Sequence, residues 1–142
     1  MKKTIGILTI FFTISFNAFS QEKFACFEND NNSNLQISIC FSQNGKARYV
    51  KYKGQNETIP LFFKKTERSE NAPGGHPRYW ISEIYVEKYR GMVTGTYTFT
   101  NAGSHGLDVT FTRKKDNKEF YFSIIEGSQD PDDGTYRKSP CW

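Results

Sequence analysis

The chain has 142 residues, with 19 Lys and Arg against 15 Asp and Glu and a formal net charge of +4. Aromatic residues make up 16% of it. This length suits one domain. The nearly balanced charge argues against nucleic acid as the main partner, because such proteins usually gather their Lys and Arg residues into a basic patch.

The first 20 residues have the pattern of a secretory signal peptide. Lys2 and Lys3 precede an apolar run from Ile5 to Phe16, and Ala18-Phe19-Ser20 places small residues at a cleavage site. The run is too short for a membrane span, which needs about 20 residues. We therefore expect an exported protein, periplasmic or secreted, with no stable membrane anchor and a single mature domain at 21–142. Without Lys2 and Lys3, 17 basic residues face 15 acidic ones.

Alternating apolar and polar residues recur along the mature domain, with turn residues between the runs. The first half predicts strands over Lys23–Glu28, Leu35–Phe41, Lys46–Lys53 and Thr58–Thr66. Asn44-Gly45 indicates a tight hairpin turn. A longer loop is expected over Glu67–Pro77, because it contains Pro73-Gly74-Gly75.

The second half predicts strands over Arg78–Lys88, Met92–Thr100, Leu107–Phe111 and Phe120–Ile124. Within Met92–Thr100, four residues should share one face and four threonines the other. The first set is Val93, Gly95, Tyr97 and Phe99, and the second set is Thr94, Thr96, Thr98 and Thr100. An acidic tail runs from Glu126 to Cys141-Trp142.

Eight strands with mostly short turns and no long helical pattern predict an all-β fold. We expect an eight-stranded antiparallel up-and-down meander barrel, since closure removes the exposed sheet edges. The alternative is a two-sheet β-sandwich. In a meander, successive connections alternate between the two ends. The connections expected at one end are Ser42–Gly45, Glu67–Pro77, Asn101–Gly106 and the start of the tail at Glu126–Gly134.

All three cysteines lie in the exported part, where an oxidising compartment favours pairing. A barrel brings its last strand beside its first, so we predict a Cys26–Cys141 disulfide with Cys40 free. Cys40, however, falls on the face opposite the apolar residues, where a free thiol would be exposed. A Cys40–Cys141 disulfide is therefore the alternative.

The sequence does not predict an enzyme or a cofactor. The two histidines, His76 and His105, lie in glycine-containing loops, and the common nucleophile, phosphate-loop and metalloprotease motifs are absent. Glu83 and Glu87 share one face of a predicted strand, which we interpret as solvated surface. The acidic segment Asp130–Gly134 lacks the ligand spacing of a calcium-binding EF-hand loop, so no metal site is predicted.

Two surfaces are candidates for binding. The first is the rim of the loop-bearing end, with Asn44, Gly45, His76 and His105, because loops on a rigid scaffold usually carry binding. The second is a basic wall with Arg48 and Lys51, where interleaved Tyr49 and Tyr52 suit an anionic glycan or lipid head group. Lysines spread around a barrel wall would explain the same residues without function.

An exported β-meander with one cysteine in its first strand and another at its end resembles small, uncharacterised periplasmic barrels of Gram-negative bacteria. The segment Asn44–Tyr49 is similar to the Ser-Gly-x-x-Tyr loop of periplasmic inhibitors of C-type lysozyme, and Lys53-Gly54 to a later Lys-Gly of that family. Asn44 stands where the family has serine, and the Gly-to-Tyr spacing is one residue longer.

The resemblance implies a non-enzymatic protein that inhibits a secreted hydrolase through loops at one barrel end, with another protein as its partner. The alternatives are a barrel that holds a small apolar ligand and an envelope protein of structural role. The many Phe and Tyr residues predicted to face inward favour a filled interior and hence protein binding.

Overall fold

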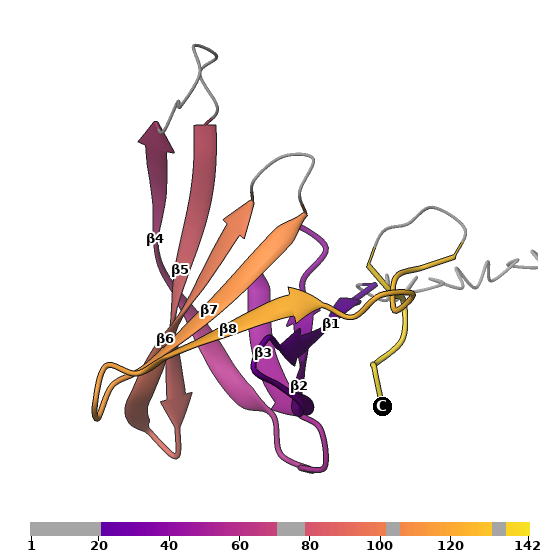
Figure 1. The fold of residues 1–142 in the computed structure, drawn as a ribbon, viewed down its shortest axis with the longest axis horizontal. Coiled ribbons are helices and arrows are strands. Elements are labelled where there is room, and N and C mark those ends of the chain that lie inside the picture. Colours follow the sequence, from indigo (N-terminus) through magenta and orange to yellow (C-terminus); the bar gives the residue numbers. More distant parts are fainter. Residues whose placement is uncertain (1–20, 71–78, 102–105, 132–135) are drawn as a thin grey trace, which may run out of the picture.

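The computed structural model describes residues 21–70, 79–101, 106–131 and 136–142. Its strands, coloured along the chain in Figure 1, are β1 (Lys23–Asn29), β2 (Asn32–Phe41), β3 (Ala47–Tyr52), β4 (Ile59–Glu70), β5 (Tyr79–Tyr89), β6 (Met92–Asn101), β7 (Leu107–Arg113) and β8 (Glu119–Ile124). In the described part of the chain, no helix is long and apolar enough to cross a bilayer.

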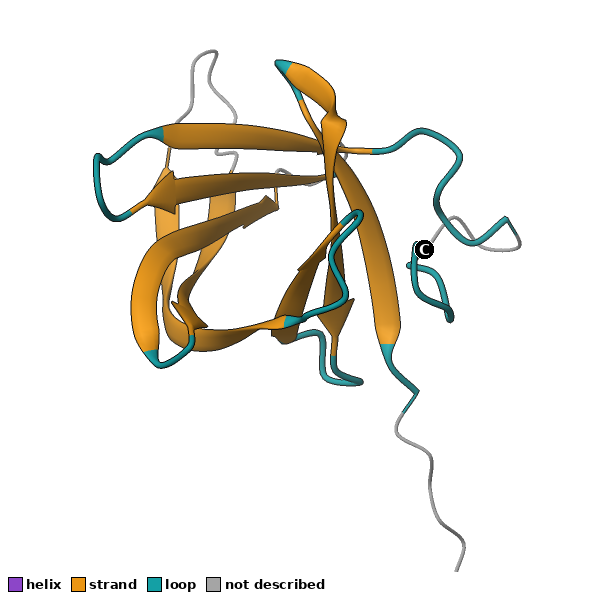
Figure 2. Ribbon diagram, turned by 90° about the horizontal axis from the view of Figure 1, so that it is seen from below, coloured by secondary structure: helices purple, strands orange, loops and turns teal. Residues whose placement is uncertain are grey.

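Each strand pairs with the next one in antiparallel fashion, and β8 pairs with β1. The sheet is therefore a closed barrel, which confirms the eight-stranded meander and sets the sandwich aside (Figure 2). We call the end with the β2–β3, β4–β5 and β6–β7 connections and the tail the loop end. The opposite end, with the four other connections, is the turn end.

Two tight turns show how local sequence defines the register. Gly45 has a φ of 79° in the β2–β3 turn, where the predicted Asn44-Gly45 pair lies. At the turn end, Arg90 and Gly91 have φ values of 49° and 79° between the paired residues Tyr89 and Met92. Positive φ at both central residues is the requirement of a type I′ turn, whose twist matches that of the flanking strands.

The barrel interior is packed with aromatic rings. Tyr97 lies with its ring centroid 4.7 Å from that of Phe111 and 6.2 Å from that of Phe99, and Phe99 contacts Tyr85 at 5.2 Å. Gly95 makes room for this packing, because a Cβ there would lie 2.2 Å from a ring carbon of Phe111. Glycine in this strand therefore marks the close approach of a neighbouring ring.

Strands β4 and β5 extend well beyond the rest of the barrel as a two-stranded ribbon (Figure 1). We define this ribbon as residues 62–70 of β4 and 79–84 of β5. β4 continues to Glu70, so the expected loop at Glu67–Pro77 was wrong for its first four residues. Cross-strand pairs from Lys65↔Ile84 to Glu70↔Tyr79 carry the ribbon outward. β3 pairs with β4 only at Tyr49↔Pro60 and Val50↔Ile59, which leaves the outer edge of the ribbon without a strand partner among the described residues.

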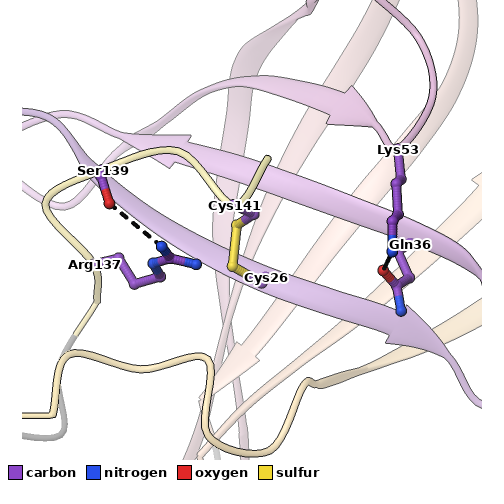
Figure 3. The surroundings of a disulfide bond; sticks show 6 residues. All are labelled: Cys26, Gln36, Lys53, Arg137, Ser139 and Cys141. Atoms are coloured by element: carbon purple, nitrogen blue, oxygen red, sulfur yellow. Dashed lines mark hydrogen bonds between the residues drawn. A yellow bond between two sulfur atoms is a disulfide. The ribbon is translucent and has the colours of Figure 1, made fainter.

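The C-terminal tail is tied to the outer face of β1 by the predicted disulfide, Cys26–Cys141 (Figure 3). The Cα atoms of the two cysteines are 5.9 Å apart. Beside it, the backbone N–H of Phe24 donates to the carbonyl of Arg137 at 2.8 Å, and the N–H of Arg137 donates in return at 2.9 Å. The tail thus supplies a partner for the part of β1 that β8 does not reach.

Cys40 is free, as predicted, but the expectation that its thiol would be exposed was wrong. Cys40 does face away from the core, yet it is fully buried. Phe24, Cys26 and Ser38 on the same outer face of β1 and β2 are buried as well. Burial raises the pKa of the Cys40 thiol, which also hydrogen-bonds with Tyr49. A buried, protonated thiol is unreactive, so it is compatible with an oxidising compartment.

Removing the disulfide with the Cys26→Ala/Cys141→Ala double substitution should lower the free energy of unfolding by about 4–5 kcal/mol. The reason is the long loop that the bond closes, with a sequence separation of 115. Denaturant unfolding measures the loss. The control is Cys40→Ala, which leaves only a small cavity and should cost about 1–2 kcal/mol. Equal losses in the two variants would contradict the assignment, as would a Cys40–Cys141 peptide in a non-reducing map.

Candidate functional site

At the loop end, the β2–β3 turn is held by its own hydrogen bonds. The N–H of Ser42 donates to the carbonyl of Lys46 at 2.8 Å, and the N–H of Gly45 donates to the carbonyl of Ser42 at 2.9 Å. The Ser42 hydroxyl donates to the side-chain oxygen of Asn44. The predicted binding residue Asn44 is exposed, with its side-chain oxygen used inside the turn.

A cavity of about 240 Å³ lies beside this turn. Gly45 lines it together with Phe41, Phe99 and Leu107, which come from three different strands. Tyr136 of the tail also lines it and stacks on Phe41, with 5.0 Å between the ring centroids. The structure therefore places Gly45 at the barrel mouth, next to the tail. His76 and His105, the other two residues predicted for this rim, lie outside the described residues.

A polar network links the turn to β5 across the same mouth. Lys46 forms an ion pair with Glu83, and the Tyr85 hydroxyl donates to Glu83 at 2.7 Å. The same hydroxyl oxygen accepts the backbone N–H of Ala47 at 3.2 Å. Burial and the hydrogen bond to Glu83 raise the pKa of Tyr85. These contacts make the loop end a fixed framework from which the ribbon projects.

The ribbon exposes large apolar side chains. Five of its residues have exposed fractions between 37% and 50%: Phe62, Phe63, Tyr79, Trp80 and Ile81. Cations lie over three of these rings: Arg68 is 3.8 Å from the Tyr79 centroid, Lys46 is 4.5 Å from Phe63, and Lys88 is 4.8 Å from Phe62. Exposed apolar surface of this kind is typical of an interaction site.

Hydrophobic patterning alone did not identify this patch, because the same alternation describes a strand with one buried face. The signal that was available is the row of charged residues Lys64, Lys65, Glu67, Arg68 and Glu70. Charges placed along one strand are a device that protects an open edge from pairing with other chains. They indicate that part of this strand has an open edge. In a fully paired barrel, no strand has such an edge.

The basic wall is partly neutralised. Arg48 pairs with Glu22, and Lys51 projects outward from β3 opposite Ser38. Tyr49 lies over Cys40 and also faces outward. Tyr52, which was expected to lie among these basic residues, instead points into the barrel and forms a 2.7 Å hydrogen bond with the hydroxyl of Tyr97. This position corrects the proposed aromatic interleaving of the wall.

Inside the turn end lies a buried polar cluster built around Glu87. This residue is 4% exposed, and the hydroxyl of Thr94 donates to its Oε1 at 2.5 Å. The Tyr97 hydroxyl also hydrogen-bonds with the carboxylate. Since a carboxylate only accepts, Tyr97 is the donor there and its oxygen accepts from Tyr52. Glu87 Oε2 has no hydrogen-bond partner among the described residues.

Burial raises the pKa of Glu87, and the hydrogen bonds from Thr94 and Tyr97 partly oppose that shift. Burial also raises the pKa of Tyr52 to about 12. The interpretation of Glu83 and Glu87 as solvated surface was therefore wrong for Glu87. Both carboxylates face inward with Tyr85, because side chains two residues apart share a face of a strand.

A bulge explains why Thr94 reaches this cluster. The β5–β6 register shifts after Glu87↔Gly95, so that Lys88 pairs with Val93 and Thr94 has no counterpart. An extra residue in one strand shifts the alternation of side chains, so the residues before it point to the opposite face of the sheet. Thr94 consequently points inward, as Tyr97 does, and Val93 is exposed, so the prediction that Val93 shares a face with Tyr97 was wrong.

No group of three or more His, Cys, Asp or Glu residues is arranged to hold a metal ion within the described ranges. Residues 132–134 of the acidic segment Asp130–Gly134 lie outside those ranges, and Oδ2 of Asp130 lies 3.9 Å from Nζ of Lys138. No protein-family model, curated protein or solved structure was found to match the chain.

The pH dependence of stability should report on Glu87. Its pKa is raised by folding, so the folded state loses stability as the pH rises from about 4 through the folded-state pKa. Glu87→Gln does not titrate. Its free energy of unfolding relative to the parent should therefore increase with pH across that window and stay constant below it.

The measurement is denaturant unfolding of both proteins at a series of pH values between about pH 3 and pH 8. A pH-independent difference would contradict a buried, titrating carboxyl. Thr94→Val gives a second check, because losing a donor to the ionised form should move the window to higher pH.

Proposed function

We propose that this chain is an exported, non-enzymatic binding protein that engages another protein through its loop end. The β4–β5 ribbon is the main contact. The single observation that carries the proposal is the exposure of five large apolar side chains on an element that projects beyond the barrel. Protein interfaces are enriched in such aromatic residues at their centres.

The scaffold below the ribbon supports this assignment. The packed rings of Tyr85, Tyr97 and Phe99 fill the middle of the barrel, which leaves little room for an enclosed apolar ligand. The Lys46–Glu83 pair and the stacking of Tyr136 on Phe41 hold the loop end in place. A rigid base lowers the entropy that a protruding element loses on binding.

The shape and charge of the ribbon favour a concave partner. A narrow ribbon fits a cleft better than a flat surface, and the active-site cleft of a secreted hydrolase has that form. The charges of the ribbon are mixed, with Lys65 paired to Glu67 and Arg68 covering Tyr79. Addition of a strand from the partner is disfavoured by the charged edge. We therefore expect side-chain contacts from Tyr79 and Ile81, which share one face of β5, to dominate.

Export is part of the proposal. It is supported by the signal-like pattern of residues 1–20, which lie outside the described residues, and by the Cys26–Cys141 disulfide. Structural disulfides persist mainly in oxidising compartments such as the periplasm or the extracellular space.

The test uses residues 21–142, which contain every strand of the barrel, as bait for purified secreted hydrolases, C-type lysozyme first. Inhibition assays and calorimetry measure the affinity. The Tyr79→Ser/Ile81→Ser variant should weaken binding about 30-fold or more, as expected when interface aromatics are truncated. Its melting temperature should change little, because both side chains are exposed.

The matched control is Met92→Ser/Val93→Ser, which removes two exposed apolar side chains at the turn end, away from the ribbon. This variant should bind as the parent does. A captured hydrolase whose affinity falls equally in both variants would place the contact elsewhere. The basic wall around Arg48 and Lys51 would then be the next surface to alter, and the rim variant Asn44→Ala/His76→Ala/His105→Ala would separate the rim from the ribbon.

A further inference from the structure

A second site lies at the opposite end of the barrel and plays no part in the proposed protein contact. A pocket of about 350 Å³ opens at the turn end, lined by Glu87 and Thr94 together with Tyr52, Ile59, Tyr89 and Phe111. This volume falls in the range of small-molecule sites. Its walls combine aromatic and apolar side chains with the polar Gln55 and Arg113, and the carboxyl of Glu87 is buried among them.

The carboxylate of Glu87 has an unmet hydrogen-bonding capacity in this pocket. Oε1 accepts from Thr94, and the carboxylate also accepts from Tyr97, whereas Oε2 has no partner among the described residues. A buried carboxylate without full pairing is costly. Two hydroxyl donors aimed at it favour its ionised form. When Glu87 is ionised, its Oε2 is therefore a buried charged oxygen at the pocket wall that lacks a donor among the described residues.

Because only Oε2 of Glu87 lacks a partner, the donor group of a ligand should be one that needs a single oxygen. A guanidinium binds best to both oxygens of a carboxylate at once, but Oε1 is already occupied by Thr94. An ammonium is a compact donor that needs only one oxygen. The rings of Tyr52, Tyr89 and Phe111 suit a cation next to an apolar body.

We propose that the turn-end pocket binds a small primary amine, with its ammonium on Glu87 Oε2 and its apolar chain between Ile59 and Phe111. The ligand class is thus a positively charged head on a short hydrocarbon body. An ionised Glu87 would repel carboxylates and phosphates.

The other charges at this end leave the site open to a cation. Arg113 also lines the pocket, but Asp116 accepts hydrogen bonds from its Nε at 3.0 Å and from its Nη2 at 2.6 Å. Glu87 of β5 and Arg113 of β7 both pair with Gly95 of β6, one from each side. The pairing of Arg113 with Asp116 nevertheless holds its guanidinium away from Glu87. At the rim, Glu57 accepts from Tyr89 at 3.0 Å and pairs with Arg90 at 3.8 Å, so this pair adds no net charge. Lys114 and Lys115 line the adjoining groove instead.

The test titrates residues 21–142 at neutral pH with n-hexylamine, n-hexanol and hexanoate, which share one chain and differ in the head group. Hexylamine should show saturable binding and bind about tenfold or more tightly than hexanol, since its charge-assisted hydrogen bond is absent from the alcohol. Glu87→Gln should remove that advantage and leave hexanol binding unchanged.

The matched control is Glu83→Gln, the same substitution on the same face of β5 but at the loop end, and it should leave hexylamine affinity unchanged. In the parent, the amide resonances of Tyr52, Gln55 and Thr94 should shift on titration, whereas those of Phe41 and Leu107 at the loop-end cavity should not. This mapping tests the site even where Glu87→Gln fails to fold. Absence of saturable amine binding, equal binding of amine and alcohol, or tighter binding of hexanoate would each overturn the proposal.

Discussion

Three residue pairs, from Phe27↔Ile124 to Asn29↔Phe122, join β1 to β8 and close the sheet into a barrel. The seam extends at both ends of this short ladder. At the turn end, the side-chain amide of Asn29 and the backbone N–H of Asp30 both donate to the carbonyl of Tyr121. Toward the loop end, Arg137 takes the place that β8 vacates beside Phe24. Every inward-facing side chain depends on this closure, because an open sheet would expose the same face to water.

The disulfide acts on the same seam. By tying Cys141 to Cys26, it keeps the tail over the outer face of β1 and β2, where Cys40 is buried. It also restricts the conformations of the unfolded chain, because almost all of residues 21–142 lie between the two cysteines. The position of Tyr136 at the loop-end mouth follows, since the tail approaches the barrel along this path. A covalent bond outside the barrel thus shapes one of its two openings.

Closure also separates two carboxylates of one strand into two environments. Glu83 and Glu87 share a face of β5, but Glu83 reaches the loop-end mouth and pairs with Lys46. Glu87 lies among Tyr52, Tyr97 and Thr94, and it forms no ion pair with a cation among the described residues. The aromatic packing around Tyr97 lies between the two ends. The barrel can therefore carry a protein-facing surface at one end and a small-molecule pocket at the other.

The amino-acid sequence by itself determined the class and order of the strands. Alternation with period two, interrupted by Asn44-Gly45 and Arg90-Gly91, is a local property that needs no partner to be interpreted. The sequence also favoured the pairing of Cys26 with Cys141, because a meander that closes must bring its two ends together, but it left Cys40–Cys141 open. These features depend on short-range geometry and on chain connectivity, and the order of residues determines both.

Only the tertiary structure decided which polar residues lie inside and which apolar ones lie outside. The bulge at Thr94 reversed the expected faces, since one extra residue changes the phase of a strand while leaving its composition unchanged. Glu87 is buried because of what β3 and β6 place opposite it, and Tyr79 and Ile81 are exposed because β3 stops covering β4 after Pro60. The burial of a side chain depends on neighbours that are distant in the chain, so hydrophobic patterning along one strand does not predict it.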